Sequence, residues 1–137
     1  MTNQLFKKPN PIPKKRITPR QAIKKGKDLE NYVADQIAAK GIDARAVRSH
    51  GSGNGNREKA DIWTSMQVLG RQAGLECKHA TSMDLPGWWR QTMKLESLGY
   101  EPILVIKQTH DQYDGTKVVI FLDTFLELVK AANAAKL

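Results

Sequence analysis

The chain has 137 residues, enough for one domain to bury a hydrophobic core without a disulfide or a structural metal. Hydrophobic residues make up 40% of it and charged residues 26%, which is typical of a soluble globular protein. No apolar run approaches the roughly 20 residues that span a bilayer, and no apolar segment like that of a signal peptide follows the basic N-terminus. We therefore expect a cytoplasmic protein with no membrane partner. The single cysteine, Cys77, predicts a buried, reduced thiol.

The net charge of +8 is concentrated at the N-terminus. The first 27 residues contain nine of the 22 lysines and arginines and none of the 14 acids, so the rest of the chain is nearly neutral. Such a basic block commonly binds a polyanion, above all nucleic acid, although a solvated tail is the alternative. Residues 1–17 combine these lysines with three prolines and have little to bury, which predicts a flexible basic arm in front of a single domain at 18–137.

A helix is predicted over residues 18–40. Thr18 and Gln21 match a capping box with a proline between them, and Gly41 is suited to end the helix. Its core-facing stripe consists of Leu29, Val33 and Ile37, at a spacing of four residues. Glu30 lies at the edge of that stripe, near the boundary of the core.

The remaining pattern predicts a mixed sheet flanked by helices, in the order α-β-β-β-α-β-β-α. We expect the strand that begins at Asp61 to pair with the strand at 70–78 in a β-hairpin that turns at Gly70. The strands at 102–106 and 118–122 are apolar throughout and are expected to be buried on both faces. The predicted elements are strands at 44–49, 61–63 and 70–78, a helix at 88–98, strands at 102–106 and 118–122, and a last helix that is capped by Asp123 and carries Phe125, Leu126, Val129 and Ala132.

Three charged residues of the central strands form a candidate site for hydrolysis. Side chains alternate along a strand, so Glu76 and Lys78 share a face and Cys77 points the other way. The expected hairpin would place Asp61 beside them. Two carboxylates and a lysine suit phosphodiester hydrolysis, in which the acids bind Mg²⁺ and the lysine orients water. The same residues also fit a solvated strand face with an ion pair, and only their neighbours favour the enzyme.

The segment between the second and third predicted elements is rich in glycine, serine and asparagine. Residues 50–57 cannot form core and are expected to form a loop that approaches phosphate closely, with positive charge from Arg48, Arg57 and Lys59. Its glycine spacing matches neither a P-loop nor a dinucleotide-binding fingerprint. His50 is a plausible DNA contact in this loop, but a surface position is the default for His50, His79 and His110.

With these residues in place, positions 25–107 resemble the archaeal-type Holliday junction resolvases of the PD-(D/E)xK nuclease superfamily. Lys25-Gly26 with Glu30 resembles the opening K-G-x-x-x-E of that family. Residues 48–53, Arg-Ser-His-Gly-Ser-Gly, resemble its R-S-x-G-S loop. Asp61 follows Ala60 where the family has proline, and residues 76–78 match the (D/E)xK element. A helix that ends at Gly99, an apolar strand that ends at Lys107, and Gln91 on the helix also fit.

The resemblance implies a restriction-endonuclease-like fold and a Mg²⁺-dependent endodeoxyribonuclease, with Mn²⁺ as a substitute metal. Such an enzyme resolves four-way DNA junctions by paired nicks during recombination and repair, and the two-fold symmetry of that substrate predicts a homodimer. Trp88, Trp89 and the apolar last helix are candidates for either the interface or the core. The implied metal ligands are Asp61, Glu76, the Cys77 carbonyl and Glu30. Lys78 would position water, and Ser49 or Ser52 would hold phosphate. The predicted DNA contacts are Arg48, His50, Arg57, Lys59, Gln91, Lys14, Lys15, Arg16, Lys24, Lys25 and Lys27.

Two other functions are compatible with the sequence. A nuclease of the same fold could act on flaps, nicks or DNA ends, and it would prefer a free terminus to an uninterrupted junction. A non-catalytic DNA-binding protein could use the basic arm alone, with the acids serving only structure. Binding that needs no metal and survives a change of Glu76 would indicate the latter.

Overall fold

The computed structural model describes residues 18–49 and 60–136. Within these ranges it is an α/β fold with three α-helices, and none of its helices is long and apolar enough to cross a bilayer. The elements are α1 (Pro19–Ala39), β1 (Val47–Arg48), β2 (Ile62–Trp63), β3 (Gln67–Val68), β4 (Arg71–Ala80), α2 (Leu85–Ser97), β5 (Glu101–Gln108), the 3₁₀ turn η3 (Tyr113–Gly115), β6 (Lys117–Val119) and α3 (Leu122–Ala134).

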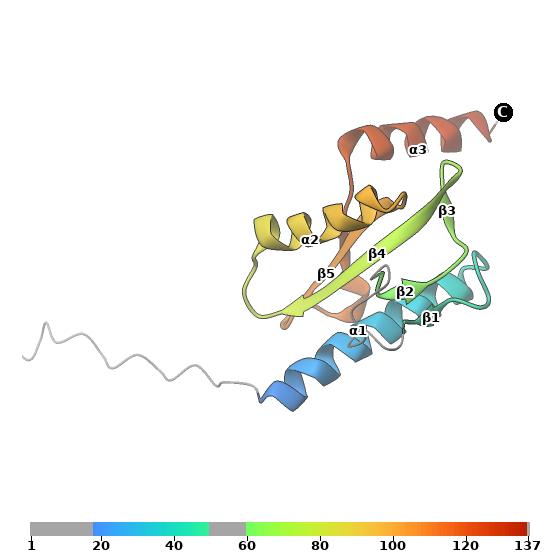
Figure 1. Cartoon of the computed structure of the whole chain (residues 1–137). Helices are drawn as coiled ribbons and strands as arrows, with labels where there is room; N and C mark the ends of the chain where they lie inside the picture. The colour runs from blue at the N-terminus through green and yellow to red at the C-terminus, as the bar shows by residue number, and fades with distance from the viewer. Residues whose placement is uncertain (1–17, 50–59, 137) are drawn as a thin grey trace, which may run out of the picture.

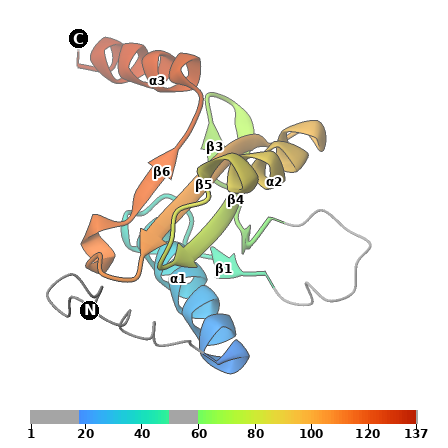
Figure 2. The same cartoon turned by 90° about the vertical axis from the view of Figure 1, so that its left-hand side faces the viewer.

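Four strands form a mixed sheet in the order β3-β4-β5-β6, and β1 pairs with β2 in a separate two-stranded sheet. β4 and β5 are parallel and are connected through α2, whereas β3 and β6 are antiparallel to their neighbours. α1 and α2 lie on opposite sides of the two long strands (Figures 1 and 2). The predicted mixed sheet with flanking helices is therefore confirmed.

The first helix follows its prediction closely. The Thr18 hydroxyl accepts a hydrogen bond from the Gln21 N–H at 3.1 Å, and the Gln21 side chain accepts one from the Thr18 N–H at 2.9 Å. The helix ends at Ala39, and Gly41 follows with a φ of 75°. Its stripe packs against alternate residues of β4. The cluster contains Leu29, Val33, Ala34 and Ile37 of the helix and Ala73, Leu75 and Cys77 of the strand.

The predicted hairpin is smaller than expected. β4 pairs with β3 across a turn in which Leu69 and Gly70 both have positive φ, while β2 pairs with β1 instead. The reason lies in the segment after β2. Asp43 accepts hydrogen bonds from the Thr64 hydroxyl at 2.7 Å and from the Ser65 N–H at 2.9 Å, which ties this segment to the connection after α1. The hairpin prediction was wrong for β2.

Two helix starts also differ from prediction. α2 begins at Leu85 rather than Trp88, because the Asp84 carboxylate accepts a hydrogen bond from the Gly87 N–H and caps the helix three residues earlier. α3 begins at Leu122 with Phe121 as its N-cap residue, so Asp123 lies in the first turn instead of capping it. An acidic residue there still favours the helix through the helix dipole.

The strands at the margins of the sheet are shorter and more exposed than predicted. Val47 and Arg48 alone form β1, out of the six residues expected. β6 covers Lys117–Val119 and is not buried, since Val118 is 59% exposed. It forms the last strand of its sheet, and an apolar strand with a neighbour on one side only keeps part of its surface in solvent.

Candidate functional site

The candidate site forms where β4 meets the turn into β2. Glu76 and Lys78 project from the same side of β4, and their side-chain charges lie 3.3 Å apart, between Nζ of Lys78 and Oε1 of Glu76. Cys77 points the opposite way, into the core against α1, as a free and buried thiol. The alternation predicted for this strand is confirmed.

Asp61 is fixed beside these residues by its backbone as well as its side chain. Its N–H donates to the Leu75 carbonyl at 2.8 Å, and its own carbonyl accepts the Ser49 N–H at 2.8 Å. Its Oδ2 accepts the Cys77 N–H at 2.7 Å. In an extended strand the N–H and C=O of one residue point to the same side, so the Cys77 carbonyl is directed toward the Asp61 side of β4. The carbonyl and the Asp61 carboxylate therefore share one border of the strand.

The pKa values of Glu30, Asp61 and Glu76 are coupled, so these three acids lie close together at the site. Burial, followed by repulsion from Glu76 and more weakly from Glu30, raises the pKa of Asp61 to about 7, against the Cys77 N–H and Lys78, which lower it. Burial also raises the pKa of Glu76, partly offset by Lys78 and Lys94. Asp61, Glu76 and Glu30 come from three separate segments, as the sequence predicted. Each carboxylate loses solvation at this site, so bringing the three together lowers the stability of the fold.

Glu30 is paired with Arg48 across the site. Its Oε2 lies 3.7 Å from an Nη of Arg48, and both side chains are largely buried, at 18% and 19% exposure. Burial raises the pKa of Glu30, while the neighbouring Arg48 lowers it and Glu76 raises it. Arg48, predicted as a DNA contact, therefore lies at the acidic cluster. The pairing links α1 to the end of β1.

The donor set fits a hard cation that keeps much of its water. Within residues 18–49 and 60–136, no group of three or more His, Cys, Asp and Glu side chains is arranged to hold a metal by itself. Mg²⁺ is usually held by one or two carboxylates together with waters and substrate phosphate. Asp61, Glu76 and the Cys77 carbonyl supply such a partial shell. Because Glu30 pairs with Arg48, the geometry favours a contact of Glu30 through water.

The predicted DNA contacts divide into two groups. Ser49 lies next to Asp61 through its N–H, and Gln91 is exposed on α2, one turn before Lys94. Lys24, Lys25 and Lys27 lie on α1 ahead of Glu30, where Lys24 pairs with Asp28 at 2.7 Å and Lys27 helps to lower the pKa of Glu30. The remaining predicted residues lie outside the described ranges: Lys14, Lys15, Arg16, His50, Ser52, Arg57 and Lys59.

Two residues near the site have roles that the sequence did not reveal. Lys94 of α2 lowers the pKa of Glu76. Its position one turn after Gln91, which was predicted as a DNA contact, could have identified it from the sequence. His79 was predicted at the surface, but it is partly buried. Its Nδ1 lies 3.1 Å from the Lys25 carbonyl and its Nε2 lies 3.5 Å from Nζ of Lys107, so the ring bridges α1 and β5. His110 is exposed, as expected.

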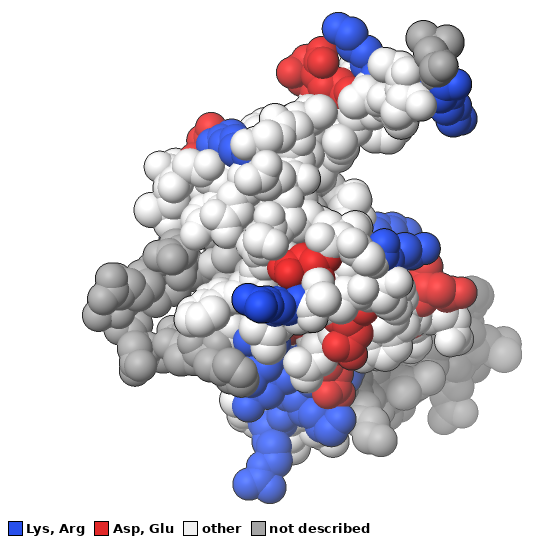
Figure 3. Space-filling model, turned by 90° about the vertical axis from the view of Figure 1, so that its right-hand side faces the viewer, with Lys and Arg blue, Asp and Glu red and all other residues white. Residues whose placement is uncertain are grey.

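One face of the molecule shows how charge is distributed around the fold. Lysines and arginines gather at its lower end, acidic and basic residues also lie at mid-height, and most of the surface between these charges and α3 is uncharged (Figure 3). In comparisons with known proteins, no protein-family model matches the chain, and no curated protein or solved structure gives a match.

Proposed function

We propose that this protein is a Mg²⁺-dependent endodeoxyribonuclease with a restriction-endonuclease-like core, and that it resolves four-way DNA junctions. The observation that carries the proposal is the convergence of Glu30, Asp61 and Glu76 with the cations of Lys78 and Arg48. Perturbed carboxylates gathered from separate segments are costly to build and are typical of functional sites. The order of these residues along the chain is the order found in the resolvase motif.

Asp61, Glu76 and the Cys77 carbonyl would hold the metal. Bound Mg²⁺ would supply Lewis-acid chemistry, by lowering the pKa of a water molecule and offsetting charge on the phosphate. The chain prepares this site in advance, because the Cys77 N–H fixes one Asp61 oxygen at 2.7 Å and leaves the orientation of the carboxylate little freedom. Removing a carboxylate from the site would therefore abolish cleavage.

Lys78 and Arg48 would act on the substrate side of the cluster. Without substrate, the Lys78 ammonium lies 3.3 Å from Glu76. When Glu76 is engaged by metal, Lys78 would orient the attacking water or stabilise charge that develops on the phosphate. Arg48, held by Glu30, would present its guanidinium to a neighbouring phosphate. Ser49 is adjacent through its backbone contact with Asp61 and would offer its hydroxyl to the same region.

Resolution of a junction requires two cuts related by two-fold symmetry. A homodimer with one site per subunit would supply both. This part of the proposal rests on the resemblance and on the symmetry of the substrate. The apolar surface of α3, discussed below, would provide the contact between subunits.

The test is cleavage of three labelled DNAs with Mg²⁺: a four-way junction, a linear duplex and a flap. We expect paired nicks in the junction alone, and their loss with a chelator or in Glu76→Gln. Asp35→Asn is the matched control, because it removes one exposed carboxylate from the outer side of α1 and should cut normally.

The other outcomes separate the alternatives. Cutting of the flap or the duplex in preference to the junction would support the proposed hydrolysis but show that the substrate is not a four-way junction. The protein could instead bind DNA tightly without cutting it, and its affinity could be unchanged in Glu76→Gln and in the absence of metal. This result would indicate a non-catalytic DNA-binding protein.

A further inference from the structure

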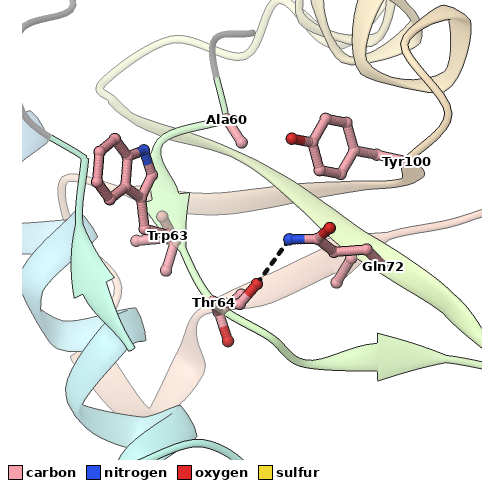
Figure 4. Close-up of a pocket in the computed structure, with 7 residues that line it drawn as sticks. Ala60, Trp63, Thr64, Gln72 and Tyr100 are labelled. Atoms are coloured by element: carbon pink, nitrogen blue, oxygen red, sulfur yellow. Dashed lines mark hydrogen bonds between the residues drawn. The ribbon is translucent and has the colours of Figure 1, made fainter. Parts of the chain in front are cut away.

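A pocket with a volume of about 340 Å³ is lined by Ala60, the residue that precedes Asp61 in the chain. Trp63 forms one wall and Tyr100 lies across from it (Figure 4). Gln72 and Thr64 supply the polar lining, while the small side chain of Ala60 leaves the pocket open between the two rings. The volume is at the low end of the range of about 300–1,000 Å³ for small-ligand pockets, so it suits one ring system rather than an extended chain.

The aromatic wall is not explained by core packing. Ile62 is buried at 2% exposure, but Trp63 next to it points the other way and is 62% exposed. A tryptophan that keeps most of its surface in solvent contributes little to folding. Its flat face is available to stack on another aromatic ring.

The polar side of the pocket is held in a fixed orientation. Nε2 of Gln72 donates to the Thr64 carbonyl at 2.9 Å, which orients the amide of Gln72 within the pocket (Figure 4). A fixed amide oxygen suits the amino group of a nucleobase. Aromatic walls with one oriented amide are the usual features of sites that take an unpaired base.

The pocket is also within reach of the strand that would be cut. Ala60 of the pocket directly precedes Asp61 in the chain. Gln72 precedes Glu76 by four residues of β4, about 13 Å at the rise of a strand. At about 3.4 Å per stacked nucleotide this distance corresponds to about four nucleotides. A base displaced from the helix near the cut could therefore enter the pocket while its strand contacts the acids.

We propose that the pocket between Trp63 and Tyr100 binds one unpaired base of the DNA strand, within about four nucleotides of the scissile phosphate. This inference rests on the proposed nuclease function and adds a device that selects DNA with bases free to unstack. The centre of a four-way junction offers such bases, and a continuous duplex does not. The pocket would favour the junction through stacking on Trp63.

The test uses 2-aminopurine, a fluorescent base whose emission depends on stacking. It is placed at single positions around the branch point of a junction and titrated with the Glu76→Gln protein, so that no cutting occurs. We expect a change in emission at positions within about four nucleotides of the cut. Trp63→Ala in the same background should abolish that change and weaken junction binding about 5- to 150-fold, the range given by the loss of one stacked base.

The matched variant is Trp63→Phe, which keeps a ring and should retain most of the signal. Because Trp63 is largely exposed, both variants should fold, and circular dichroism checks this. If the Trp63→Ala variant shows the same emission change and the same junction affinity as the Glu76→Gln protein, the pocket assignment is overturned, even if the wild-type enzyme cuts junctions. If the wild-type protein cuts no DNA, the nuclease proposal fails separately. Titration of single-stranded 2-aminopurine DNA then tests the pocket on its own. An emission change that Trp63→Ala abolishes supports the pocket, and a change that does not depend on Trp63 overturns it.

Discussion

At the scale of single residues, Asp61 illustrates how this site is built against the stability of the fold. Two hydrogen bonds of its backbone and one of its side chain hold the residue in place, yet its carboxylate is buried near two other acids. Its pKa of about 7 means that the metal-free protein must ionise it at a cost near neutral pH. A bound cation would remove that cost.

This cost predicts how the stability of the metal-free protein depends on pH. The folded pKa of about 7 is above the usual value of 3.8, so the folded state binds the proton first. The stabilising contribution of the Asp61 proton is complete below about pH 4 and is lost as the pH rises through 7, by up to about 1.4 kcal/mol per pH unit. The free energy of unfolding, from urea titrations with a chelator at pH 5.5 to 8, should show this slope.

Asp61→Asn should remove the Asp61 part of that slope and raise stability at pH 8, because it eliminates the burial of a charged carboxylate and its repulsion from Glu76. The measured quantity is the difference from wild type, since the lowered pKa of His79 acts in the opposite direction below pH 6.5. Asp35→Asn should leave the curve unchanged. A slope in Asp61→Asn equal to that of wild type would show that this carboxylate is not the group that titrates, because Glu30 and Glu76, whose pKa values are also raised, contribute only the remainder.

The sequence could predict these residues because their spacing along a strand determines their side. Glu76, Cys77 and Lys78 alternate by geometry alone, and the motif order pointed to Asp61 and Glu30. Arg48 was predicted as a DNA contact and not as a partner of Glu30. That contact depends on how α1 packs across β1, and no local pattern encodes it.

At the scale of elements, β4 organises the fold. Its odd-numbered residues from Ala73 to Cys77 pack on α1, and Gly74 on the other side allows Tyr100 and α2 to approach. Arg71 at the start of the strand binds the carbonyls of Gly99 and Glu96 at the end of α2. The strand thus joins both helix layers and carries Glu76 of the acidic cluster.

The approach at Gly74 predicts a severe effect of a single methyl group. A Cβ on residue 74 would lie 2.6 Å from Cβ of Tyr100 and 3.3 Å from Cβ of Leu95. Neither atom can move without its backbone, so Gly74→Ala should lower the free energy of unfolding by about 1–3 kcal/mol. The control is Gly26→Ala in α1, where nothing lies within 4 Å. It should raise stability by about 0.5–1 kcal/mol, since alanine favours a helix.

Urea unfolding of the two variants beside wild type makes the comparison. Equal, small effects of both substitutions would contradict the tight packing between β4 and Tyr100.

The sequence predicted β4 and α1 well because their apolar periodicity is strong. It placed β2 correctly but gave it the wrong partner, because the hydrogen bonds that Asp43 accepts from residues 64 and 65 join segments about 20 residues apart.

At the scale of the whole molecule, α3 is the helix that the other described residues, 18–49 and 60–121, leave mostly uncovered. It lies apart from the sheet, beyond β6 (Figures 1 and 2). Thr124 is its one buried residue, held by a hydrogen bond from its hydroxyl to Glu101 at 2.6 Å. Four large apolar side chains share one helical face and are 39–71% exposed: Leu122, Phe125, Leu126 and Val129. A helix of 13 residues is marginal in water without a packing partner.

In the homodimer proposed above, a second copy of the chain would pack on this face. Asp123 lies in the first turn of α3, and Lys130 lies in its second half. Two copies of α3 packed antiparallel about a two-fold axis would place Asp123 of each near Lys130 of the other. The same axis would relate the two active sites that a junction requires.

Leu126→Asp places a charge in the middle of that apolar face and should convert a dimer into a monomer in sedimentation velocity experiments. The monomer should keep its fold, because Leu126 is 53% exposed, and should still nick a junction, but in one strand per encounter. Glu127→Gln on the opposite face of the helix is the control and should remain dimeric. A wild-type protein that sediments as a monomer, or a dimer unaffected by Leu126→Asp, would remove α3 as the contact between subunits. Paired nicks by a true monomer would remove the requirement for a dimer altogether.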